Sequence, residues 1–71
     1  MNSHDYEVLA EAFGLSLADT ADDSARSTVL RVLGNVTRML TETYPRFRQG
    51  NFMGQVYENE VLIRRRRLSQ S

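Results

Sequence analysis

The residues whose chemistry stands out first are four consecutive arginines near the end of the chain: Arg64, Arg65, Arg66 and Arg67. A guanidinium group binds phosphate or carboxylate through two parallel hydrogen bonds, and it stacks on planar bases. Arg46 and Arg48 carry the same group earlier in the chain. These side chains predict, as one functional hypothesis, a nucleic-acid-binding site of low sequence specificity.

Three adjacent apolar residues come directly before the arginines: Val61, Leu62 and Ile63. Neighbouring side chains of a helix or a strand point in different directions, so a single core cannot bury all three. We therefore predict a partner-binding site made of these residues, with the four arginines as its cationic rim. The partner is either another protein or a second copy in a homodimer. The pattern leaves open whether this segment is helical, extended or frayed.

Residues suited to catalysis or to metal binding are scarce in this chain. It has one His, His4 near the start, and neither Cys nor Lys. General acid–base and nucleophilic catalysis need a titratable group that is held by a second group. The acidic run of residues 19–24 lacks the glycine and the final glutamate of a calcium-binding loop, so we interpret it as a helix cap. We expect a protein that is not an enzyme and that holds no metal or cofactor.

The charged residues are unevenly distributed, although nine basic and nine acidic residues give a net charge of zero. Residues 1–25 hold six acids and no arginine, whereas residues 26–71 hold nine arginines and three acids. Opposed charge patches steer protein partners towards each other and fix their register. The acidic segment of residues 1–25 would also repel a nucleic acid. The distribution therefore favours a protein partner.

A helix over residues 24–44 is the element predicted to organise the fold. Five side chains recur there at helical spacing on one stripe: Val29, Leu33, Val36, Leu40 and Tyr44. Residues 22–24 supply acceptors for the first N–H groups, and Pro45 disfavours helical geometry in the residue before it. Because the charged stripe of this helix is narrow, we expect the middle helix to be the longest and the most buried.

Gly34 lies within this helix, and Thr37 and Thr41 follow it on the same stripe. A glycine in a helix interior costs about 1 kcal/mol relative to alanine. The close approach of another helix backbone would explain why glycine stands here. We therefore predict that Gly34 marks a helix–helix contact.

Two shorter helices are predicted on either side. One covers residues 3–13, with Asn2 or Ser3 as its cap and Gly14 as its end. The other covers residues 49–58. The predicted core combines residues from all three helices and from the turn before the last: Leu9, Phe13, Leu33, Val36, Leu40, Phe47 and Phe52.

The length of 71 residues is enough for one small domain. We predict an all-α, three-helix domain over residues 1–60 and an apolar, arginine-rich C-terminal extension over residues 61–71. A core of this size contributes only about 3–5 kcal/mol to the stability of the fold. Because the chain has no Cys, self-association is the remaining common source of additional stability. The absence of Cys fits a reducing cytoplasm, and no apolar run approaches the length of a membrane span or forms a signal-peptide core. We therefore expect a cytoplasmic protein.

Two short motifs resemble those of a family of very small bacteriophage and prophage proteins. The matching residues are Asp5, Tyr6, Leu9, Ala10, Pro45, Arg46, Phe47 and Phe52. The relatives usually have Asn before the proline, Asp after the first Phe and Arg before the second Phe. At those positions this chain has Tyr44, Arg48 and Asn51. The relatives also end near the position of Tyr57, so the resemblance covers residues 5–57.

The resemblance implies a viral or prophage origin and a compact helical fold, and the family offers no activity to transfer. We therefore expect a small phage or prophage accessory or regulatory protein in the cytoplasm of the host cell. It would act by binding a host or viral protein. The alternative is arginine-mediated, largely non-specific nucleic-acid binding.

Overall fold

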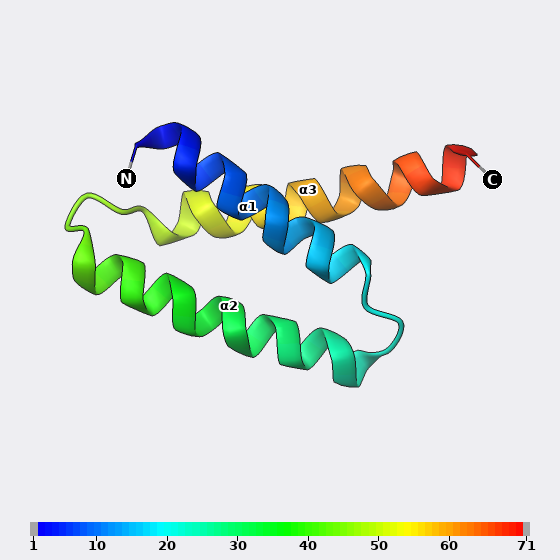
Figure 1. Cartoon of the computed structure of the whole chain (residues 1–71), viewed down its shortest axis with the longest axis horizontal. Helices are drawn as coiled ribbons and strands as arrows, with labels where there is room; N and C mark the ends of the chain where they lie inside the picture. The colour runs from blue at the N-terminus through cyan, green and yellow to red at the C-terminus, as the bar shows by residue number, and fades with distance from the viewer. Residues whose placement is uncertain (1, 71) are drawn as a thin grey trace.

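The computed structural model describes residues 2–70, which form three α-helices and no strand (Figure 1). Helix α1 spans Ser3–Ala18, α2 spans Asp23–Thr43 and α3 spans Gln49–Gln70. The prediction of an all-α, three-helix fold is therefore confirmed. Met1 and Ser71, the outermost residues of the predicted domain and extension, lie outside the described residues.

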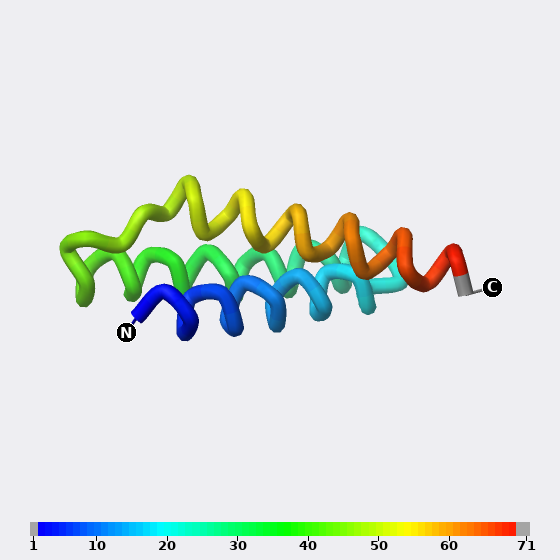
Figure 2. The backbone as a smooth tube through the Cα atoms, turned by 90° about the horizontal axis from the view of Figure 1, so that it is seen from above, coloured from blue at the N-terminus to red at the C-terminus, as the bar shows by residue number. Residues whose placement is uncertain are grey.

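The three helices form a flat, elongated arrangement whose axes measure 42 × 25 × 15 Å. Helices α1 and α3 run in the same direction and cross, while α2 runs back beside them (Figures 1 and 2). Helix α1 packs chiefly on α3 and much less on α2. The last turns of α3 extend beyond the end of α1 (Figure 1).

The helix ends follow local rules of capping. The Asn2 side chain accepts a hydrogen bond from the Asp5 N–H at 3.0 Å, and the Asp5 carboxylate accepts one from the Asn2 N–H at 3.2 Å. The Asp22 carboxylate caps α2 by accepting from the Ala25 N–H at 2.8 Å. Helix α2 ends at Thr43, so the predicted bounds of this helix are confirmed to within one residue at each end.

Gly14 does not end the first helix, and that prediction is wrong. Helix α1 continues to Ala18, and Gly14 is buried against α3. A methyl group at this position would lie 2.5 Å from the Asn59 Cβ atom and 2.9 Å from the Val56 carbonyl oxygen. Because such distances are below van der Waals contact, glycine is needed here for the close approach of two helices.

Gly34 does not mark a close helix contact, and that prediction is also wrong. The residue is exposed, and a methyl group placed on it would meet nothing beyond the local helix within 4 Å in residues 2–70. Gly34 lines an open groove between α2 and the start of α3, together with Arg38 and Gln49. The glycine therefore has no packing role among the described residues.

The buried cluster takes residues from all three helices: Ala10, Leu17, Leu33, Phe52 and Val56. Leu9, Phe13 and Phe47 are half-buried against it, as predicted, whereas Val36 and Leu40 are half-buried outside it. Helix α2 contributes Leu33 alone to this cluster, and α3 is one residue longer than α2. The expected dominance of the middle helix is therefore wrong. Helix α1, which buries four small or apolar residues, packs on both other helices and most closely on α3.

The C-terminal segment is helical, which settles the alternatives left open by its sequence. Helix α3 continues without a break from Gln49 to Gln70, twelve residues past the expected end at residue 58. The boundary expected after residue 60 therefore falls inside α3. Residues 61–70 are the last turns of a helix whose first half belongs to the core.

Candidate protein-binding surface

A buried carboxylate, Glu60, joins α3 to α2. Its side chain is 8% exposed and accepts hydrogen bonds from both terminal nitrogens of Arg26 and from Arg64 Nε at 3.0 Å. Burial of a carboxylate is tolerated because guanidinium groups pair with it. The hydrogen bond from Arg26, with a second from Arg64, holds the pKa of Glu60 below its usual range. The same contact raises the pKa of Arg26.

Two of the four consecutive arginines bind the C-terminal end of α1. Arg64 Nη2 donates to the Leu17 carbonyl oxygen at 2.9 Å, and Arg67 Nη1 donates to the Ala18 carbonyl oxygen at 3.3 Å. Arg67 Nη2 also donates to Asp19 Oδ1 at 2.6 Å. The last carbonyls of a helix have no partner within it, and cationic side chains are favourable there. Arg64 and Arg67 therefore stabilise the contact between α3 and the end of α1.

The predicted partner-binding residues are thus divided by the structure. Val61 and Leu62 are each 45% exposed, and Ile63 is half-buried. Arg65 and Arg66 are exposed and form no ion pair within residues 2–70. Val61, Leu62, Arg65 and Arg66 remain accessible to a partner, on different edges of α3.

One edge of α3 carries a continuous uncharged surface that we call the outer stripe: Gly50, Gly54, Tyr57 and Val61. These residues follow one another at intervals of four, three and four, so they share one helix face. Tyr57 is 41% exposed, and in the described part of the chain methyl groups placed on Gly50 or Gly54 would meet nothing beyond the local helix within 4 Å. The outer stripe is therefore a smooth apolar surface about 16 Å long.

The opposite edge of α3 meets α1 along a second accessible surface, which we call the α1–α3 face: Val8, Glu11, Leu15, Leu62 and Arg66. A groove of about 290 Å³ runs between the two helices, lined by Glu11, Leu15, Ile63, Arg66 and Arg67. Val8 is 52% exposed and Leu15 is 44% exposed. Apolar side chains thus alternate with charged ones on this face.

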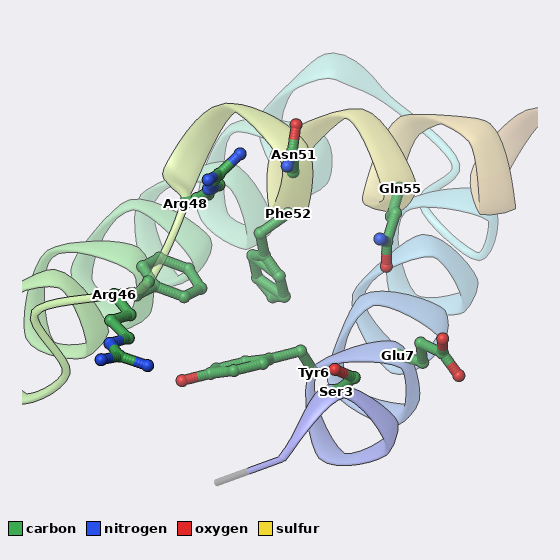
Figure 3. A pocket seen from close by; sticks show the side chains of 9 residues that line it. Ser3, Tyr6, Glu7, Arg46, Arg48, Asn51, Phe52 and Gln55 are labelled. Atoms are coloured by element: carbon green, nitrogen blue, oxygen red, sulfur yellow. The ribbon is translucent and has the colours of Figure 1, made fainter.

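Arg46 and Arg48 lie at the other end of α3, beside a pocket of about 240 Å³ between α1 and the α2–α3 turn (Figure 3). The Tyr6 and Phe47 rings are 5.3 Å apart, and Phe47 and Phe52 are 5.5 Å apart, so aromatic contacts fix the turn. About 24 Å of helix separates Arg48 from Arg64. The six arginines of the nucleic-acid hypothesis therefore form two separate groups.

Sequence reasoning did not identify Glu60 or Tyr57 as site residues. It also missed the exposed residues of α1 that face α3, which are Val8, Glu11 and Leu15. Glu60 precedes Arg64 by four residues, which is the spacing of a helical ion pair. Val8 and Leu15 stand seven residues apart on one helix face, with Glu11 between them. These signals were available, but they depend on knowing that both segments are helical.

Comparisons with known proteins add no family assignment. No family model matches the chain, and neither the curated proteins nor the solved structures gave a match. Within residues 2–70, no helix is long and apolar enough to cross a membrane. In the same part of the chain, no three His, Cys, Asp or Glu side chains are grouped as metal ligands would be.

Proposed function

We propose that this chain is a small accessory or regulatory protein of a phage or prophage. It acts in the host cytoplasm by binding a host or viral protein, and it has no catalytic activity of its own. The resemblance of residues 5–57 to small phage proteins supports the origin. The observation that carries the binding role is the outer stripe of α3, because a helix face that is apolar and exposed for about three turns is a common docking surface.

The two glycines of the outer stripe indicate the shape of the partner. Each helical glycine costs up to about 1 kcal/mol relative to alanine, and no contact among the described residues requires glycine at position 50 or 54. A partner helix that packs on this edge would gain from glycine, since small residues let two backbones approach closely. Tyr57 and Val61 would then supply the apolar contact beyond the glycines.

The test is affinity capture from host lysate with the immobilised full-length chain, using Val61→Glu to disrupt the outer stripe. Val32→Glu on α2 is a matched control, because Val32 is 48% exposed and Val61 is 45% exposed. We expect proteins that are retained by the original chain and by the control but lost with Val61→Glu, in the presence of nuclease. If both variants retain the same proteins, the outer stripe is not the binding surface.

The nucleic-acid alternative would use Arg46, Arg48, Arg65 and Arg66, which form no ion pair with any described residue. Material whose capture disappears with nuclease would favour it. Four phosphate contacts predict that log K falls with log salt concentration at a slope of about −3.6 on duplex DNA. A measured slope shallower than about −2 would exclude simultaneous use of the four arginines.

A further inference from the structure

The α1–α3 face has an apolar centre and two charged groups that are not paired. Leu15 and Ile63 line the groove, and Leu62 stands one turn before Arg66 on the edge of α3 that faces α1. Glu11 and Arg66 both line this groove. Neither forms an ion pair with the other or with any other residue of the described chain. The face therefore offers one acid and one base to an incoming molecule.

The two charges lie on opposite sides of the apolar centre. Helices α1 and α3 run in the same direction (Figure 1). Gly14 packs against Asn59 and Glu60, which places Leu15 and Leu62 at similar heights along the two helices. Glu11 precedes Leu15 by four residues, and Arg66 follows Leu62 by four residues. Each charge is thus about 6 Å from the centre, in opposite directions.

This placement makes the face complementary to itself. A two-fold axis that lies in the plane of the face, perpendicular to the line from Glu11 to Arg66, brings the two faces together and places each Glu11 opposite the Arg66 of the other chain. The contact occurs twice, as an isologous interface requires. The apolar side chains Val8, Leu15 and Leu62 then pack across the axis. We propose that the α1–α3 face is the interface of a symmetric homodimer of this chain.

The distribution of charge along the chain also supports a second copy of the chain as the partner at this face. Six of the nine acids lie in residues 1–25, and four of the nine arginines lie in residues 64–67. An end-for-end pairing brings the acidic α1 of one copy towards the basic end of α3 of the other. Burial of the α1–α3 face would also add apolar contacts to a core cluster of five buried residues.

A charge-swap pair tests the proposal by sedimentation equilibrium. Glu11→Arg sets arginine against Arg66 of the other copy, and Arg66→Glu sets glutamate against Glu11. Each variant alone should therefore dimerise about tenfold more weakly or worse. In an equimolar mixture, both cross-chain contacts again join an acid and a base. We expect the mixture to form a heterodimer with an affinity close to that of the original chain.

The matched controls are Glu42→Arg and Arg31→Glu, at exposed positions on α2. Both should dimerise like the original chain, and circular dichroism should show equal helix content in every variant. A charge contact within one chain would not be restored by mixing, so heterodimer formation reports an interface between copies.

The proposal is overturned if the original chain is a monomer at all accessible concentrations, or if mixing restores no dimer. It is independent of the outer stripe, because Val61→Glu should leave dimerisation unchanged. Failure of the dimer and failure of partner capture are therefore separate results.

Discussion

Gly14 and Gly34 are both interior helical glycines, but they have opposite surroundings. At Gly14 the backbones of α1 and α3 are too close for a side chain, and Ala10 and Ala18 on the same helix are also buried. At Gly34 there is open space, and α2 is held by Leu33, the buried Thr37 and the Arg26–Glu60 pair. Small residues make the tight helix pair, whereas the clearest amphipathic pattern belongs to the more loosely held helix.

Truncation of core leucines should give the largest contrast between the two regions. Leu17→Ala on α1 should lower the free energy of unfolding by about 2–5 kcal/mol, because Leu17 is fully buried between helices. Leu40→Ala on α2 should cost clearly less, since Leu40 is half-buried. Urea unfolding followed by circular dichroism measures both. Equal losses would mean that α2 packs as tightly as α1.

Gly14→Ala tests the helix crossing directly. Alanine is the better helix former, but its methyl group would overlap the α3 backbone, so we expect a loss of about 1–3 kcal/mol. The same urea experiment applies, with Gly54→Ala as a control on an open helix face. A stabilised Gly14→Ala variant would contradict the close approach of α1 and α3.

Glu60 should make stability depend on pH in the acid range. Its pKa in the folded chain is lowered by Arg26 and Arg64, so the carboxylate stabilises the fold above the pKa of the unfolded chain. This stabilisation is lost as the pH falls through the lower folded-state value. Glu60→Gln should cost about 1–3 kcal/mol at neutral pH and flatten the acid side of the stability profile. Glu58→Gln is the exposed control, and an identical profile for both variants would refute this role.

Gly34→Ala and Gly54→Ala should give the smallest effect, and it should have the opposite sign to that of Gly14→Ala. Each should raise the free energy of unfolding by about 0.5–1 kcal/mol, because alanine restricts the unfolded chain and meets no obstacle in the fold. Thermal unfolding of the three variants side by side is sufficient. A loss at Gly34 would reveal a contact of α2 that only glycine permits.

The features predicted correctly from the sequence act over a few residues. Asp22 caps the N–H group three residues later, and the Asn2–Asp5 box has the same reach. Pro45 disfavours helical geometry in Tyr44, the residue before it. The apolar spacing identified Leu33 as buried, because helical period alone places a side chain on a face. Helix number and type, and most helix ends, follow from such local signals.

Tertiary structure decided how the helices pair and which arginines are accessible. Arg26 and Glu60 are 34 residues apart, and Arg64 binds a carbonyl 47 residues away. Gly14 has the sequence signature of a helix end, yet α1 continues because contact with α3 stabilises it. Helical period predicts that a face is buried but does not identify the helix that covers it. That choice depends on the fit of side chains from distant segments, which for this chain favours small residues on α1 against α3.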